Sequence, residues 1–341
     1  MGPLGPIFRM RFRDGSHFET MGETEEDAMA HENIVVVGID GSEAGNSALE
    51  WALAQARARQ ARLHIVCGYE LPSQYMSPEF QVSQGNVNHL YDSARKIVDE
   101  AVASVEGQGV EVTSALEFGD PTEVLVEISK RVALVVVGGR AQHTSRLADR
   151  LLRTVSSAVP ANAYCPTVVV PTDSPRSHVP IERVVCGVDG SEHAKMALQR
   201  AVWEADRWNA KLTVVVVVNP TSVGWVPAYT FRDEHLAEME AEVAAQLAQV
   251  DEGRDIDVEI QALEGSPAHI LAQMSEESDL VVLGTRGRGG FTGLLLGSTS
   301  QTLLGYSACP TMVVPRRVRI GDDCGPGPAQ VVDDDEPGIT G

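Results

Sequence analysis

The sequence has no long apolar stretch and no secretory signal that we can recognise. Its longest hydrophobic run, at 214–218 with its neighbours, is far shorter than the roughly 18 residues of a membrane-spanning helix. Arg9, Arg11 and Arg13 are not followed by a hydrophobic stretch, so we do not expect a cleaved leader. These absences argue against a membrane or secreted protein.

Positive charge is also scarce. The chain carries 27 Lys and Arg against 48 Asp and Glu, a formal net charge of −21 at pH 7. Such a charge opposes binding to nucleic acids and to anionic membranes. We therefore expect neither as a partner, and an anionic ligand would have to be held by local hydrogen-bond donors.

Cysteines are few and show no metal-binding or redox spacing. Four of the five lie in or beside apolar segments, which predicts buried thiols in a reducing cytoplasm and no metal site. The five are Cys67, Cys165, Cys186, Cys309 and Cys324.

The chain is a tandem duplication. Its 341 residues suit two domains, and four segments recur in the same order about 145 residues later. The matching pairs are 34–42 with 184–191, 119–121 with 265–267, 134–138 with 280–284, and 165–171 with 309–315. We predict a disordered tail at 1–31, a first domain at 32–171, a linker at 172–181, a second domain at 182–316 and an acidic disordered tail at 317–341.

Within each repeat, short runs of β-branched residues alternate with helical segments. Continuous valine runs indicate strands buried on both faces, hence a parallel sheet in an α/β fold. We predict two doubly wound domains, each a five-stranded parallel sheet with helices on both faces. In the second repeat the expected strands are 183–188, 211–218, 256–263, 279–283 and 311–314, and the expected helices are 192–209, 233–251, 267–277 and 298–306.

A glycine-rich stretch follows the fourth expected strand of the second repeat. Six glycines lie between 284 and 297, and Ser298 then opens a helix. Glycine lets backbone N–H groups approach a phosphate, and a helix N-terminus offers free donors and partial positive charge. This stretch is typical of an anion site, most simply a nucleotide. In a doubly wound sheet it would share a cleft with Asp189, at the end of the first strand.

Motifs of other nucleotide and hydrolytic enzymes are absent. No Gly-Lys pair occurs, so there is no Walker-type loop, and the stretch 287–292 is one residue short of a dinucleotide fingerprint. Neither a Gly-x-Ser-x-Gly elbow nor a His-Glu-x-x-His helix is present. We expect His193 and His269 to be solvated helix residues. Without a general base, efficient ATP hydrolysis is not expected, although slow hydrolysis stays open.

The pattern resembles the universal stress protein family in its tandem-domain form. ATP-binding members carry Gly-x2-Gly-x9-Gly-(Ser/Thr) and an Asp ending the first strand. The matching residues are Gly284, Gly287, Gly297 and Ser298 for the first motif, and Asp40 and Asp189 for the second. The resemblance spans about 33–170 and 182–315. It implies an adenine nucleotide alpha hydrolase-like fold, ATP as ligand with Mg²⁺ accompanying it, and a regulatory role in stress or dormancy.

By this resemblance, the second domain should hold ATP. Asp189 would accept from the base or ribose, Val217 would line the adenine pocket, and the glycines would bring backbone donors to the ribose and phosphates. The alternative role of Asp189 is to form the turn and cap the following helix. For Arg286 and Arg288 the alternative is a solvated charge on the loop. The full set is Gly187, Val188, Asp189, Val217, Gly284, Thr285, Arg286, Gly287, Arg288, Gly297, Ser298 and Thr299.

The first domain departs from the motif. Gly138 remains, but Ala141 stands where the second glycine belongs and no Gly-Ser pair follows. We expect a degenerate site there, with weaker candidates Gly38, Asp40, Gly138 and Arg140. Two other functions stay open: a slow ATPase or phosphotransferase, and a nucleotide-free scaffold for a protein effector. The last strand, 311–314, is expected at a sheet edge, where pairing would allow a homo-oligomer or join the two domains.

Overall fold

The structure is a computed structural model that describes residues 33–70, 84–139, 154–172, 178–218, 230–287 and 295–316. Within 84–88 and 230–233 only the backbone is described. The tails expected at 1–31 and 317–341 lie outside the described residues, as do 173–177 of the expected linker. No helix among the described residues is both long and apolar enough to cross a membrane.

The first repeat alternates strands and helices from Ile34 to Pro171. Helix starts follow local capping: Ser42 accepts from the amide of Gly45 at 3.1 Å, and Asp120 accepts from that of Thr122 at 2.7 Å. The elements are β1 (Ile34–Gly38), α2 (Glu43–Ala58), β2 (Arg62–Tyr69), α3 (Gln84–Val105), β3 (Val112–Phe118), α4 (Pro121–Ile128), β4 (Leu134–Gly139), α5 (Val155–Asn162) and β5 (Thr167–Pro171).

The second repeat has the same order of elements, and the predicted strands and helices lie within about three residues of those observed. Ser191 caps the first helix by accepting from the amide of Ala194 at 3.2 Å. The elements are β6 (Arg183–Val188), α6 (Glu192–Trp208), β7 (Lys211–Val218), α7 (Thr230–Val250), β8 (Val258–Glu264), α8 (Pro267–Ser275), β9 (Leu280–Gly284), α9 (Ser298–Tyr306) and β10 (Thr311–Val314).

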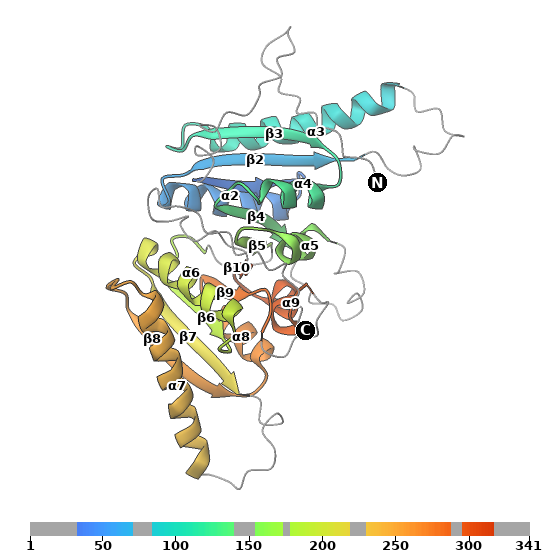
Figure 1. The fold of residues 1–341 in the computed structure, drawn as a ribbon. Coiled ribbons are helices and arrows are strands. Elements are labelled where there is room, and N and C mark those ends of the chain that lie inside the picture. The colour runs from blue at the N-terminus through green and yellow to red at the C-terminus, as the bar shows by residue number, and fades with distance from the viewer. Residues whose placement is uncertain are drawn as a thin grey trace, which may run out of the picture.

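The two repeats share one ten-stranded sheet, ordered β3-β2-β1-β4-β5-β10-β9-β6-β7-β8 (Figure 1). Pairing within each repeat is parallel, which confirms the predicted fold class. Between the repeats, β5 and β10 pair antiparallel, with Met312 opposite Val168. The strands of the two repeats therefore point in opposite directions. We call the side of the sheet at which the strands of a repeat end the carboxyl edge of that repeat, and the two carboxyl edges lie on opposite sides of the sheet.

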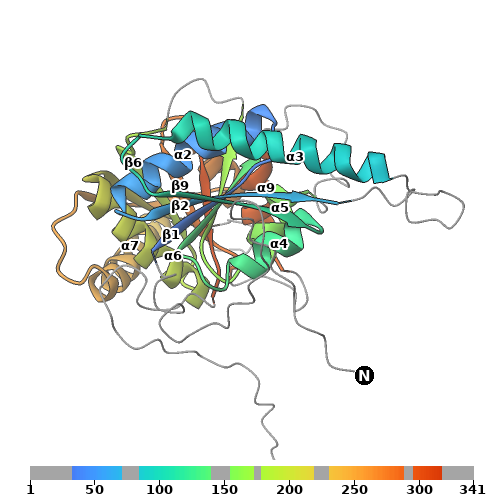
Figure 2. The same cartoon turned by 90° about the horizontal axis from the view of Figure 1, so that it is seen from above.

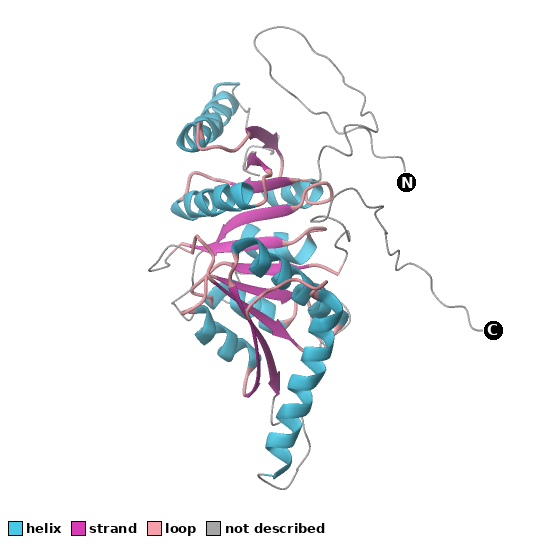
Figure 3. Ribbon diagram, turned by 90° about the vertical axis from the view of Figure 1, so that its left-hand side faces the viewer, coloured by secondary structure: helices cyan, strands magenta, loops and turns pink. Residues whose placement is uncertain are grey.

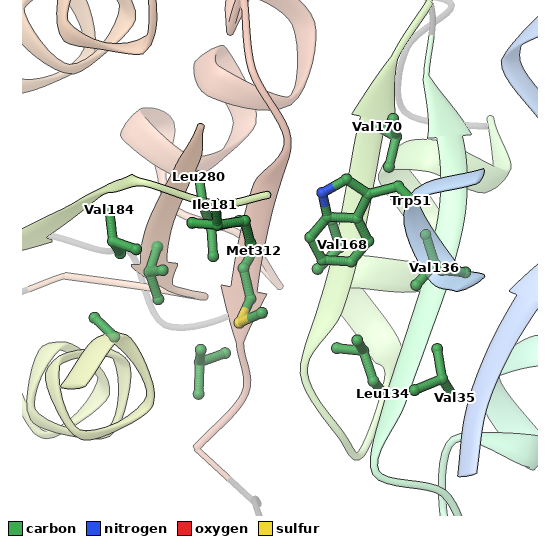
Figure 4. Close-up of a cluster of buried hydrophobic side chains, with 14 of the residues drawn as sticks. Val35, Trp51, Leu134, Val136, Val168, Val170, Ile181, Val184, Leu280 and Met312 are labelled. Carbon is green, nitrogen blue, oxygen red and sulfur yellow. The ribbon is translucent and has the colours of Figure 1, made fainter. Parts of the chain in front are cut away.

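Helices cover both faces of this sheet (Figures 2 and 3). On one face α2, α3, α6 and α7 pack over a hydrophobic core that runs through both repeats. At the junction Trp51 of α2 lies beside Val168, with Met312 across from it (Figure 4). On the other face, α4 with α5 and α8 with α9 cover two separate cores. Because the central strands are buried on both sides, they are near-continuous valine and leucine.

The prediction that β10 is an edge strand of its sheet is wrong. This strand is not a free edge, because β5 of the same chain occupies it; the edges of the ten-stranded sheet are β3 and β8. Burial explains the choice: all four residues of β10 and all five of β5 are buried. Separating the two strands would expose their apolar side chains to water and leave their facing backbone N–H and C=O groups without strand partners. Joining the two domains was the alternative use of this strand, and it is the one observed.

Candidate nucleotide site

The site that the sequence predicts lies where the strand order of the second repeat reverses. β6 sits between β7 and β9 and runs parallel to both. The loops after β6 and after β9 therefore leave the same edge of the sheet side by side, as expected from the sequence. Such a switch point is where open α/β sheets bind ligands.

Asp189 connects the two loops. Its Oδ1 accepts a hydrogen bond from the amide of Ser191 at 3.0 Å, so the carboxylate shapes the turn before α6. Its Oδ2 lies on the other side, only 2.2 Å from where a Cβ on Gly287 would stand. The turn-forming role is thus present, and the second oxygen also faces the glycine loop. Any side chain at 287 would displace this carboxylate.

Gly297 opens α9, and no close contact with the described residues requires glycine there. Its φ of −74° and ψ of 159° are accessible to any residue, and the nearest atom to an added Cβ is 3.5 Å away. Its amide donates to the carbonyl of Thr285 at 2.7 Å, which ties the helix start to the loop after β9. No side chain caps α9. The amides of its first turn, at Ser298 and Thr299, therefore have neither an intrahelical acceptor nor a side-chain cap among the described residues.

Two other glycines of the predicted site are required by packing. A Cβ on Gly284 would stand 2.7 Å from the carbonyl oxygen of His193, and one on Gly187 would stand 2.7 Å from Leu283. The first repeat has the same arrangement, since a Cβ on Gly138 would stand 2.3 Å from the carbonyl oxygen of Ala44. Gly284 is therefore needed to pack helix against strand, in addition to any contact with a ligand. Helix and strand backbones touch there, and no side chain fits.

The remaining predicted residues divide between the two faces of the sheet. Val217 is half-buried against the α8 and α9 core, on the side to which Gly187 also faces. Val188 is buried in the opposite core under α6, away from Val217. Thr285 is buried, and its amide donates to the carbonyl of Val314 at 3.1 Å. Arg286 is half-buried beside Gly297, and Arg288 lies outside the described residues.

His193, which we expected to be solvated, is half-buried at this edge. It lies in the first turn of α6, with its backbone over Gly284. Burial lowers the pKa of His193, and the charges of Arg316 and Arg286 lower it further, whereas Asp189 and Glu192 raise it. The sequence gives no periodicity that places these groups together. The pairing of β9 with β10 is what brings Arg316 to the site.

A family model described as "Universal stress protein family" matches residues 33–171 and again 180–315, which is most of the chain.

The chain belongs to the universal stress protein family.

Relatives in the family are tandem proteins of similar length. "Universal stress protein Rv1996" of Mycobacterium tuberculosis (strain ATCC 25618 / H37Rv) is 31% identical over 301 residues, covering 82% of this chain and 94% of the relative. A universal stress protein of Mycolicibacterium smegmatis (strain ATCC 700084 / mc(2)155) is 30% identical over 291 residues, covering 83% and 97%.

Among solved structures, a universal stress protein from Archaeoglobus fulgidus DSM 4304 aligns with a TM-score of 0.62 and 21% identity. The alignment covers 84% of this chain and 99% of the Archaeoglobus chain. At this identity the match supports the fold and no more. The shared fold is the α/β arrangement with parallel strands described above.

The first repeat of this universal stress protein presents a different carboxyl edge. Asp40 repeats the turn of Asp189, its Oδ1 accepting from the amide of Ser42 at 2.9 Å. A Cβ on Gly38 would stand 2.8 Å from a terminal methyl of Leu125, which would have to shift to make room. The strand registers place Gly68 where the second repeat has Val217, and Pro121 lies 2.9 Å from its missing Cβ. Gly138 packs as described above, and Arg140 lies outside the described residues.

An aromatic cluster replaces aliphatic and acidic residues at this edge of the first repeat. The rings of Tyr69 and Phe118 meet edge to face at 5.5 Å, and that of Tyr91 lies 6.1 Å from Tyr69. The corresponding residues at the ends of β7 and β8 are Val218 and Glu264. The two ends of the sheet therefore differ in shape and polarity although their folds match.

Metal ligands are not gathered within the described ranges. No group of three His, Cys, Asp or Glu side chains there could hold an ion. The four cysteines in the described ranges are buried thiols, and burial raises the pKa of Cys186 beyond its normal range. Cys324 lies outside the described residues.

Proposed function

We propose that this universal stress protein binds ATP at the carboxyl edge of β6 and β9, and that the bound nucleotide regulates a stress or dormancy response. The observation that carries the proposal is Gly297. Neither its backbone angles nor its neighbours among the described residues require glycine, yet it starts a helix whose first amides have no intrahelical acceptor. A ligand that approaches this helix end closely is a physical reason for the missing side chain.

The neighbouring groups suit the parts of ATP. The amides of Ser298 and Thr299 and the guanidinium of Arg286 would take the phosphates. Asp189 would accept hydrogen bonds from the ribose or base, and Val217 would pack against adenine. Mg²⁺ would be bound through the phosphates, because the described residues offer no ligand cluster of their own. The overall charge of −21 makes these local donors the necessary source of attraction.

The test is calorimetric titration of ATP into the full chain and into a Gly297→Ala variant. A methyl at 297 has room in the protein but would occupy the approach to the helix end, so we expect at least tenfold weaker binding without loss of fold. Ser266→Ala is the matched control, since Ser266 starts α8, a helix of equal length, also without a side-chain cap bond. It should bind ATP as the wild type does.

Three results would contradict the proposal. A wild-type chain that gains no thermal stability in millimolar ATP favours a scaffold without nucleotide, since ligand at 100 times Kd should add about 2.7 kcal/mol. Equal weakening by Ser266→Ala would show a nonspecific effect of helix capping. Sustained phosphate release by the wild type, lost in Gly297→Ala, would instead make the protein an ATPase.

A further inference from the structure

His193 is held at the edge of the sheet by the same close contact that requires Gly284. The first turn of α6 crosses the end of β9 so tightly that a Cβ on Gly284 would stand 2.8 Å from the Cβ of His193. His193 is half-buried there. Its backbone and Cβ could leave the edge only if the first turn of α6 moved away from β9.

Two arginines reach this edge from neighbouring strands. β9 and β10 are in register at Gly284 and Val314, and Thr285 continues the pairing through its amide. Arg286 and Arg316 each lie two residues beyond that register pair. Arg286 also contacts the start of α9, its Cα standing 3.5 Å from the position of a Cβ on Gly297.

The charged groups around His193 come from each element that meets here. Arg286 follows β9, Arg316 follows β10, Asp189 ends β6, and Glu192 belongs to the first turn of α6 itself. Burial and the two arginines outweigh the two carboxylates, so the imidazole is neutral at pH 7 before a ligand arrives.

We propose that His193, Arg286 and Arg316 form a cationic rim that contacts the phosphates of the bound nucleotide, and that His193 takes up a proton when the phosphates arrive. This inference rests on the proposed ATP binding. The rim adds two residues, His193 and Arg316, that lie outside the glycine motif. It also makes the site select for ligands that carry phosphate charge.

The direction of the pH dependence follows from linkage. A polyphosphate beside the imidazole favours its charged form, so His193 binds more protons in the complex than in the free protein. Affinity for ATP should therefore rise as the pH falls from about 8 towards 6, the interval in which histidine titrates. Each unit by which binding raises the pKa corresponds to about tenfold in affinity.

The experiment measures proton uptake directly. ATP with excess Mg²⁺ is titrated into the full chain by calorimetry, in buffers of different ionisation enthalpy at each pH. We expect fractional proton uptake in the wild type. In His193→Gln we expect uptake to disappear and affinity to become flat with pH, at the wild-type value for high pH. His235→Gln is the matched control, because His235 lies on α7 with its side chain 50% exposed. This variant should show the same proton uptake and the same ATP affinity as the wild type.

An arginine variant separates charge from shape. Arg316→Gln removes a charge that lowers the pKa of His193, so its proton uptake should shift to higher pH while ATP affinity falls. Uptake that persists unchanged in His193→Gln would overturn the proposal, as would ATP binding with no proton exchange in the wild type. A chain that binds no ATP in any buffer would overturn the proposed function first, and the rim with it.

Discussion

The glycines of the motif divide into two physical classes. Gly284 and its counterpart Gly138 lie under helix backbones at 2.7 and 2.3 Å from an added Cβ, so they are needed to assemble strand and helix. Gly287 faces a carboxylate, whereas a Cβ on Gly297 would make only ordinary van der Waals contacts with the described residues, the nearest at 3.5 Å. Sequence spacing cannot distinguish these classes, because it records only that a side chain is missing and not what occupies its place.

Substitution of the two classes should have opposite effects. We expect Gly284→Ala to lower the free energy of unfolding by about 1–3 kcal/mol, because the methyl would overlap the carbonyl of His193. Gly297→Ala should change it by less than about 0.5 kcal/mol, since its Cβ meets nothing closer than 3.5 Å. Urea unfolding of both variants measures this. Equal stability of the two would mean that α6 yields easily and that the packing reason is wrong.

At the scale of elements, α2 and α6 meet across the repeats through a buried charge cluster. Arg59, at the end of α2, pairs with Glu204 of α6, and both side chains are at most 2% exposed. Arg200 and Arg207 approach the same carboxylate at 3.2 and 3.3 Å. Within its own repeat Arg59 has the neutral acceptor Gln55 at 3.2 Å, so its carboxylate partner comes from the other repeat.

Loss of this carboxylate should be severe. We expect Glu204→Gln to destabilise the protein by about 3–5 kcal/mol, because three guanidinium groups would then lose the buried carboxylate that they share. Glu259→Gln is the matched control: its partner Lys211 lies 2.6 Å away, but both side chains are more than 40% exposed. That change should leave the midpoint of chemical unfolding close to the wild-type value. Similar losses in the two variants would refute the role of burial.

The same cluster sets a pH dependence. Burial alone would raise the pKa of Glu204, but Arg59, Arg207 and Arg200 together lower it to about 2, against 4.5 for a free glutamate. A depressed pKa contributes stability above the unfolded value, and that contribution is lost as the pH falls from 4.5 towards 2. The stability difference between the wild type and Glu204→Gln should therefore be constant near neutral pH and shrink through this interval. A difference that stays constant down to pH 3 would contradict the assignment.

At the scale of the whole molecule, the two repeats share one core on one face of the sheet, and on the other face each has its own core, with Leu304 of α9 packed against that of the first repeat. The core under α2, α3, α6 and α7 is continuous across β5 and β10. Because this core includes side chains of both repeats, neither can open there without exposing apolar surface of the other. The carboxyl edges of the repeats nevertheless lie apart, so a ligand at one edge has no direct contact with the other.

This continuity predicts cooperative unfolding. We expect the ligand-free chain to show a single calorimetric transition, and Met312→Ala, which opens a cavity at the junction, to lower that transition as a whole. Residue 312 is fully buried opposite Val168. Two resolved transitions, of which only one moves in the variant, would show that the repeats unfold independently.

The sequence alone determined the secondary structure, the duplication and the family. Valine runs buried on both faces, Ser and Asp caps, and repeated spacing are local signals, and they predicted the strands and helices of the second repeat closely. They also predicted that Asp189 and the loop at 284–287 lie close together, because neighbouring parallel strands end at the same side of the sheet.

Only the tertiary structure decided what fills the space around those residues. It joined β10 to β5 of the same chain, placed Val188 in the core opposite Val217, and brought His193 and Arg316 beside Arg286. These contacts join residues far apart in the chain, and they depend on how helices cross strands at distances of 2–4 Å. The spacing of residues along the sequence does not report such distances, so the packing glycines and the cationic rim could be found only in the folded chain.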